Sequence, residues 1–154
     1  MSSYLVSGSV AAIFFTLLTL SLCCARSVDV ESWADHKKTV IVENDIGPNI
    51  VLALHCWSSE DDFGVHTLNH KENFKWRFKV NWKGTTKFVC ESGWYDSGES
   101  PGYQEKFTAF KSSRDWSANC EDDCWWSIRR DGGYYGDAIA SDKYPPKKMF
   151  SYHK

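Results

Sequence analysis

Four cysteines are the residues with the clearest capacity for chemistry. Cys56 directly follows His55, Cys90 stands alone, and three residues separate Cys120 from Cys124. Thiolates and an imidazole at such spacings can bind zinc, whereas an even number of cysteines can instead form two disulfides. Disulfides persist only in oxidising surroundings, so the choice depends on the compartment in which the protein works.

The first residues of the 154-residue chain indicate that compartment. Residues 10–24 form an uncharged, largely apolar run, which is shorter than the roughly 20 residues of a membrane span. Small residues follow at Ala25 and Ser27, although no Lys or Arg precedes the run. We predict a secretory signal peptide over residues 1–25, cleaved after Ala25 or Ser27, and a secreted, extracellular protein. The alternative is an uncleaved anchor; after cleavage, no stable membrane insertion is expected.

Secretion favours two disulfides over a zinc site, because Cys23 and Cys24 leave with the signal peptide and four cysteines remain. No metal and no other cofactor are therefore expected. In the chain-entropy model, a cross-link between distant segments contributes about 3.5–4.5 kcal/mol, and a Cys120–Cys124 link about 2 kcal/mol. The preferred pairing is Cys56–Cys124 with Cys90–Cys120. The exchanged long-range pairing is nearly as favourable.

The histidines and the acidic runs could support catalysis or calcium binding. His55 with His66 or His70 could act as the acid and base of a ribonuclease-like reaction. No histidine lies in a recognisable catalytic motif, so we predict no catalytic residue and no enzymatic activity. The acidic runs at 60–62 and 121–123 lack the spaced ligands of a dedicated calcium loop, and we interpret them as solvated loops.

Short apolar runs separated by turn residues must position these side chains. In residues 74–81 apolar and polar residues alternate without a break, as expected of a strand with one buried face. The Lys83-Gly84 turn makes this strand and the next a hairpin candidate, and Asp131-Gly132-Gly133 predicts a second hairpin. The strands are expected at residues 39–44, 49–57, 74–81, 85–90, 104–110, 124–129 and 134–139. This pattern predicts an all-β fold, a small antiparallel β-sandwich in which disulfides join the facing sheets.

Composition and charge limit the partners. The net charge is −2 and the sequence shows no basic stripe, so no nucleic-acid partner is expected. Of eight tryptophans, Trp76 and Trp126 are expected in the core. Sugar stacking would require several of the others to be exposed together, the candidates being Trp57, Trp94, Trp116 and Trp125. We expect the domain to span residues 28–142, and residues 143–154 to form a lysine-rich tail lying loosely on its surface.

The order of several short motifs resembles that of the plant self-incompatibility S-protein homologue family. The matching residues are Val40-Ile41-Val42-Glu43-Asn44, Leu54-His55-Cys56-Trp57-Ser58, Glu60-Asp61-Asp62-Phe63-Gly64, Phe74-Lys75-Trp76-Arg77-Phe78, Thr85-Thr86-Lys87-Phe88-Val89-Cys90, Trp94, Cys120-Glu121-Asp122-Asp123-Cys124-Trp125 and Gly132-Gly133-Tyr134. The resemblance implies a secreted β-sandwich with two disulfides and no enzymatic activity. The best-understood members of that family are ligands that a membrane protein on pollen recognises during pollen rejection.

We therefore expect a monomeric, non-enzymatic extracellular signalling ligand that a cell-surface receptor recognises. The candidate receptor-binding residues lie in two polar loops, residues 60–63 and 96–102, because such loops are free of core contacts. The residues are Glu60, Asp61, Asp62, Phe63, Asp96 and Glu99. The alternative is a secreted cell-wall or glycan-binding module, or a defence protein. Glycan binding or inhibition of microbial growth would favour these alternatives.

The signal-peptide prediction can be checked on the protein recovered from the medium of expressing plant cells. N-terminal sequencing should find Arg26 or Val28 as the first residue, because cleavage follows a small residue. A secreted protein that begins at Met1 would contradict the prediction.

Overall fold

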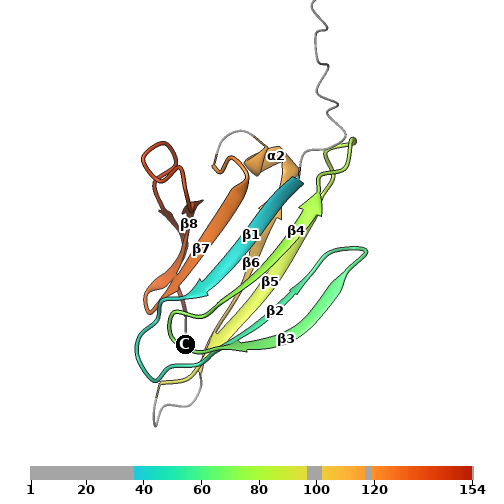
Figure 1. The fold of residues 1–154 in the computed structure, drawn as a ribbon. Coiled ribbons are helices and arrows are strands. Elements are labelled where there is room, and N and C mark those ends of the chain that lie inside the picture. Colours follow the sequence, from blue (N-terminus) through green and yellow to red (C-terminus); the bar gives the residue numbers. More distant parts are fainter. Residues whose placement is uncertain (1–36, 97–101, 117–118, 154) are drawn as a thin grey trace, which may run out of the picture. The chain divides into compact units, whose positions relative to one another are not determined.

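The computed structural model describes residues 37–96, 102–116 and 119–153, which form two packed β-sheets (Figure 1). The predicted signal peptide and Glu99 lie outside these residues. The all-β sandwich expected from the sequence is confirmed. The described strands are β1 (Lys37–Asn44), β2 (Leu52–Trp57), β3 (Asp62–Leu68), β4 (Asn73–Lys79), β5 (Lys87–Trp94), β6 (Tyr103–Lys111), β7 (Asp123–Arg129), β8 (Gly132–Asp137) and β9 (Lys147–Phe150), with one helical turn, α2 (Ser112–Asp115), between β6 and β7.

The strands pair in the orders β4-β1-β7-β8-β9 and β3-β2-β5-β6. Neighbours are antiparallel except for β1 and β7, which run parallel with Thr39 beside Asp123. The hairpin predicted at Asp131-Gly132-Gly133 is confirmed, because β7 pairs with β8. The hairpin predicted from residues 74–81 and 85–90 is wrong: β4 pairs with β1, and β5 pairs with β2 and β6. After β4 the chain crosses to the other sheet, so the apolar faces of β4 and β5 lie opposite each other across the core.

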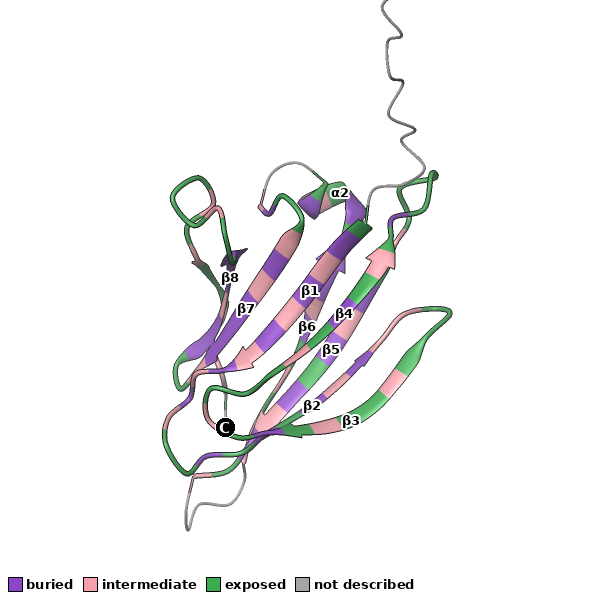
Figure 2. Ribbon diagram, in the orientation of Figure 1, coloured by how far each residue is buried: buried purple, intermediate pink, exposed green. Residues whose placement is uncertain are grey.

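The core consists of the side chains that point between the sheets. Figure 2 shows the resulting bands of alternating burial along β1, where Val40 and Val42 are fully buried. Trp76 and Trp126 are buried as predicted. Trp94 is also buried, and its ring stacks on Tyr103 with 4.1 Å between centroids. Each large apolar side chain buried in this way contributes about 1.5–3 kcal/mol.

Asn44 fixes the end of the sandwich at which β1 finishes. Its side chain is fully buried, and its amide nitrogen donates to the carbonyl oxygens of Ile50 and Leu68, each at 2.8 Å. Its Oδ1 accepts from the backbone N–H of Ile46 at 3.1 Å. A buried polar group must be satisfied in this way, and here it ties the β1–β2 connection to the end of β3.

The disulfides are Cys56–Cys90 and Cys120–Cys124, so the preferred pairing of Cys56–Cys124 with Cys90–Cys120 is wrong. Cys56 lies directly opposite Cys90 on neighbouring antiparallel strands, with 4.1 Å between their Cα atoms. Loop-closure entropy is a property of the unfolded chain, whereas the register of β2 and β5 determines which thiols meet in the folded one. This disulfide therefore lies within one sheet and does not join the two sheets as expected.

The C-terminal segment, expected as a loose tail, is part of the domain. Residues 147–150 form β9, which pairs with β8. Phe150 and Tyr152 pack against the core, and the Tyr152 hydroxyl lies 2.7 Å from that of Ser92. The partial burial of these two aromatic residues stabilises the position of the segment on the sheet.

Removing each disulfide separately tests the observed pairing. The double variant Cys56→Ala/Cys90→Ala should lower the free energy of unfolding by about 4 kcal/mol, and Cys120→Ala/Cys124→Ala by about 2 kcal/mol, because the first closes the longer loop. Urea unfolding measures both values. Peptide mapping of the oxidised protein provides the control, and a peptide linking Cys56 to Cys124 would contradict the structure.

Candidate functional site

A groove of about 640 Å³ opens between the β2–β3 and β4–β5 connections. Its volume is that of a ligand-binding site, which typically measures about 300–1,000 Å³. Phe78 and Phe88, which also pack in the core, form its base. The lining residues are Trp57, Ser58, Ser59, Glu60, Asp61, Phe78, Lys79, Asn81, Thr85, Thr86, Lys87, Phe88 and Val89.

Local hydrogen bonds hold the first rim of the groove, residues 58–61. The Ser58 hydroxyl accepts from the backbone N–H groups of Glu60 and Asp61, at 3.1 and 2.9 Å. The backbone N–H of Ser58 donates to the carbonyl oxygen of Asp61 at 2.7 Å. Side-chain bonds of this kind are typical of tight polar turns, and they leave the two carboxylates exposed on a fixed backbone.

Asn81 organises the second rim, residues 81–87. Its Oδ1 accepts from the backbone N–H of Thr85 at 2.8 Å, and its Nδ2 donates to the Thr85 hydroxyl at 2.7 Å. The backbone N–H of Asn81 donates to the Thr86 hydroxyl at 2.9 Å. Gly84 permits the tight turn with a φ of 66°. Both rims are therefore ordered without a ligand, which lowers the entropic cost of binding.

The groove has opposite charges on its two rims and an aromatic base. Glu60 and Asp61 stand exposed on the first rim and Lys87 on the second, and Lys79, the last residue of β4, also lines the groove. The lining residues include neither histidine nor cysteine. The hydroxyls of Ser58, Thr85 and Thr86 act in the rim bonds described above. This arrangement suits the binding of a polar partner with an apolar tip.

The structure separates the two loops predicted to bind a receptor. Trp57 pairs with Val89 and Ala53 pairs with Gly93, so the chain leaves β2 and β5 at opposite ends of the sheet. Residues 60–62 therefore lie beside the groove, and Asp96 lies at the other end, where it forms an ion pair with Arg130. Glu99 lies outside the described residues. The structure thus does not bring Asp96 together with the acidic residues of the first loop.

Phe63 differs from the other candidates because its ring packs against the core. Its centroid lies 5.3 Å from that of Trp76 and 5.9 Å from those of Phe74 and Phe88. The premise that the whole loop is free of core contacts is therefore wrong for this residue. Residues 62–68, partly assigned to a loop, form the edge strand β3, and Phe63 anchors it.

His55 and Asp62 form a pair on the outer face of the four-stranded sheet. The imidazole Nε2 lies 2.6 Å from Asp62 Oδ1, and the His55 ring lies 4.8 Å from that of Trp57. The backbone N–H of Gly64 and then His55 lower the pKa of the Asp62 carboxyl. Among the described residues, no three His, Cys, Asp or Glu side chains converge as metal ligands.

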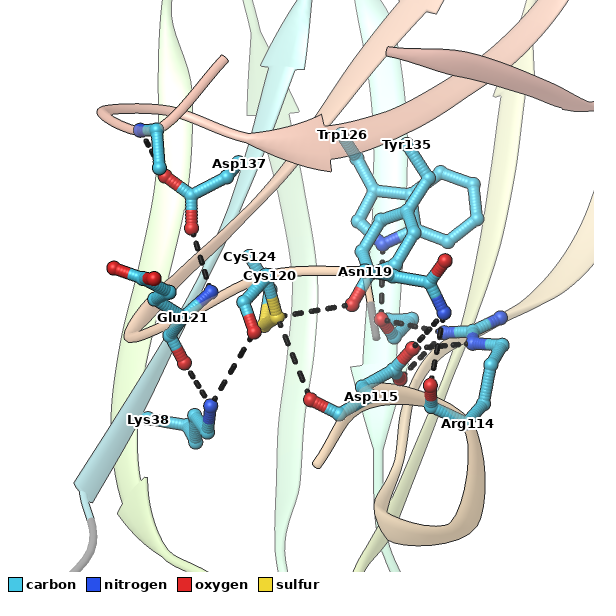
Figure 3. The surroundings of a disulfide bond; sticks show 12 residues. Lys38, Arg114, Asp115, Asn119, Cys120, Glu121, Cys124, Trp126, Tyr135 and Asp137 are labelled. Atoms are coloured by element: carbon cyan, nitrogen blue, oxygen red, sulfur yellow. Dashed lines mark hydrogen bonds and ion pairs between the residues drawn. A yellow bond between two sulfur atoms is a disulfide. The ribbon is translucent and has the colours of Figure 1, made fainter. Parts of the chain in front are cut away.

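The short disulfide lies at the centre of a buried polar network (Figure 3). The Lys38 ammonium donates to the carbonyl oxygens of Cys120, at 3.5 Å, and Glu121. The side chain of Asp137 accepts from the backbone N–H of Glu121 at 2.7 Å. Burial lowers the pKa of Lys38, and nearby carboxylates, led by Asp122, oppose that shift. The Cys120–Cys124 loop thus supplies the acceptors for a lysine pointing between the sheets.

Asp115, fully buried, holds the chain that leads into this loop. It accepts from the Arg114 guanidinium at 2.6 and 2.8 Å and from the backbone N–H of Lys111 at 2.7 Å. The guanidinium lies 4.7 Å from the centroid of the Tyr135 ring, whose hydroxyl can donate to Cys120 Sγ at 3.4 Å. A buried charge requires partners of this kind. The bonds to Asp115 therefore hold α2 and the chain leading into β7 in place.

Sequence reasoning missed the second rim of the groove. Asn81 was expected at the end of the strand 74–81, and Thr85 and Thr86 at the start of the strand 85–90. Which connection faces them across the groove depends on the pairing of the strands. The alternation in β4 indicated which face is buried. It did not show that residues 80–86 cross to the other sheet, and no local signal marked the groove.

Comparison with known proteins identifies the family. The family model described as "Plant self-incompatibility protein S1" matches residues 39–152. The chain belongs to this family. Among its relatives, S-protein homolog 2 of Arabidopsis thaliana is 35% identical over 62% of this chain and 58% of its own length, so the match spans less than two thirds of that relative. S-protein homolog 19 of the same plant is 32% identical over 82% of this chain and 87% of its own.

A solved structure shows the same fold. It is of "SPH (Self-Incompatibility Protein Homologue) proteins", described as a widespread family of small, highly stable, secreted proteins from plants. It covers 77% of this chain and 96% of its own, with a TM-score of 0.54 and 20% identity. Membership of the S1 family therefore places this protein among small secreted plant proteins. In the part of the chain that the structure describes, no helix is long and apolar enough to cross a membrane.

The buried network predicts a specific response to alkaline pH. Burial, followed by the charge of Asp115, raises the pKa of the Tyr135 hydroxyl well above its ordinary value of 10.0. The stability that this residue contributes is complete below pH 10.0 and is lost as the pH rises, because the unfolded chain ionises first. Tyr135→Phe should therefore make the decline in unfolding free energy above pH 10.0 shallower.

Urea unfolding at a series of alkaline pH values measures this response. Tyr95→Phe is the control, because Tyr95 is 66% exposed and should leave the decline unchanged. Because the pKa of Lys38 is lowered, its effect on the unfolding free energy changes with pH in the opposite direction, and both variants retain this effect. Identical slopes for Tyr135→Phe and the wild type would show that Tyr135 is not held neutral by its surroundings.

Proposed function

We propose that this protein is a monomeric, non-enzymatic extracellular ligand. A cell-surface receptor binds it at the end of the sandwich that carries the groove. The observation that carries the proposal is the pair of pre-ordered rims around an aromatic base. Polar loops held on a rigid sheet are where proteins commonly present binding residues. The exposed carboxylates of Glu60 and Asp61 supply specificity, because complementary charges steer a partner and exclude others.

The rims favour a receptor over a small diffusible substrate. Oppositely charged side chains stand on the two sides of an open groove, so a protruding receptor segment can contact both at once. Its apolar tip would pack on Phe78 and Phe88, and its polar flanks would face the two rims. Such an arrangement, with a buried apolar centre and a polar surround, is typical of protein interfaces.

Pollen rejection is the first process in which to test this function, because the matching family is that of a plant self-incompatibility protein. Expression confined to the stigma, with binding to pollen, would support it. Expression in roots or leaves would instead direct the search for a receptor to those tissues. The proposal of a receptor ligand holds in either case.

Binding of labelled, secreted protein to plant cell surfaces tests the site. Glu60→Gln/Asp61→Asn should weaken binding by about tenfold or more, because both rim charges are lost. The matched control is Asp96→Asn/Asp131→Asn, which removes the same charge at the other end of the sandwich, where Asp96 contacts Arg130. This control should bind as the wild type does.

Thermal unfolding of both variants must first show that the fold is retained. Loss of binding in the control with full binding in the groove variant would place the receptor site at the opposite end. Equal binding by all three proteins would exclude the two groove carboxylates. Absence of wild-type binding to every tissue tested would contradict the receptor-ligand function.

A further inference from the structure

Trp82 has the most exposed large apolar side chain among the residues that the structure describes. It is 86% exposed, whereas tryptophan side chains are highly buried on average in folded proteins. An indole that packs in a core or an interface buries about 150–250 Å² of surface. The indole of Trp82 thus contributes little to the core and is accessible to a partner.

Trp82 stands at the tip of a closed turn. The backbone N–H of Gly84 donates to the carbonyl oxygen of Asn81 at 3.0 Å, so Trp82 and Lys83 are the central residues of a β-turn. The connection that carries this turn projects past the end of β4 (Figure 1). Asn81 and Thr85 both line the groove, and Trp82 lies between them in the chain. The indole therefore stands beside the groove.

The chain is fixed on both sides of this turn. Val80, immediately before it, is buried in the core. After it, the carbonyl oxygen of Thr86 accepts from the backbone N–H of Ser112 at 3.0 Å and from the Ser112 hydroxyl at 3.1 Å, which ties the turn to α2. Together with the bonds of the second rim, these contacts present Trp82 on an ordered backbone. Binding through such a backbone loses less conformational entropy than binding through a mobile loop.

Lys83 places a positive charge beside the indole. Its ammonium lies 5.3 Å from the centroid of the Trp82 ring, within the range of a cation–π contact. A partner that covers the indole therefore also meets this cation. An apolar pocket with a carboxylate at its mouth complements both groups.

We propose that Trp82 is the anchor residue of receptor binding: its indole enters an apolar pocket of the receptor protein, and an acidic side chain of that pocket faces Lys83. This inference rests on the receptor-ligand function proposed above and names the residue on which the affinity depends most. Tryptophan is among the residues that most often dominate the affinity of protein interfaces. The interface is then reciprocal, because the groove accepts a receptor segment and Trp82 enters a receptor pocket.

A lipid surface is the other class of partner that suits an exposed tryptophan beside a lysine. The first rim of the groove argues against it. Glu60 and Asp61 stand exposed across the groove from the turn, and anionic headgroups would repel their carboxylates. A receptor protein can carry different charges opposite the two rims, so it complements both of them.

Binding of labelled protein to plasma-membrane vesicles tests the anchor, with vesicles from the tissue whose cells bind the wild type. Trp82→Ala should weaken binding about thirtyfold or more, and Trp82→Phe, which keeps an aromatic ring, should weaken it less. The matched control is Tyr95→Ala, which removes a 66% exposed aromatic side chain just beyond the opposite end of β5. This control should bind as the wild type does.

Two further measurements separate binding from folding and protein from lipid. Urea unfolding should give nearly the same free energy for Trp82→Ala and the wild type, because an exposed side chain contributes little to the fold. Protease-treated vesicles, and vesicles of phosphatidylserine and phosphatidylcholine, should not bind the protein. Trp82-dependent binding to either would replace the receptor pocket with a lipid surface.

Undiminished binding by Trp82→Ala, or an equal loss in Trp82→Ala and Tyr95→Ala, would overturn the proposal. Either result leaves the receptor-ligand function in place, because the wild type still binds. Weak binding by Trp82→Ala with full binding by Glu60→Gln/Asp61→Asn would support the anchor and exclude the groove carboxylates. Failure of the wild type to bind vesicles from every tissue contradicts both proposals.

Discussion

Phe88 packs between the two sheets, and its neighbours come from both of them. Its centroid lies 4.6 Å from that of Phe78 and 5.6 Å from that of Trp76, both on β4, and 5.9 Å from that of Phe63 on β3. The first of these pairs is also the base of the groove. A hydrophobic contact that joins the sheets therefore also sets the spacing of the two rims.

The buried polar network serves the same end of the sandwich. Asp115 fixes α2, Lys38 fixes the Cys120–Cys124 loop, and Tyr135 contacts the sulfur of that loop. Because buried charges are costly unless they are paired, the bonds of this network hold its members in place. In the other sheet, the Cys56–Cys90 disulfide links β2 to β5. The strands and connections that carry the two rims are therefore held in place.

Local patterns in the sequence were enough to predict part of this structure. Alternation in β4 and the Gly-rich turn before β8 correctly indicated a buried face and a hairpin, since both depend on residues close in the chain. The pairing of Cys56 with Cys90, the place of Phe150 in the core and the crossing from β4 to β5 depend on strand order. Glu60 and Asp61 lie on an exposed connection, as predicted, and Asp62 begins β3. Their separation from Asp96, and the position of the Asn81 rim across the groove, follow from the pairing of the strands.

We infer that one end of the sandwich, with its groove and two ordered rims, is the surface that a receptor binds. Hydrogen–deuterium exchange of the protein bound to receptor-bearing cell membranes tests it most directly. On binding, we expect slower exchange for the backbone amides of residues 58–61 and 81–86, with no change for residues 94–96 and 130–132. Slower exchange confined to residues 94–96 and 130–132 would contradict it.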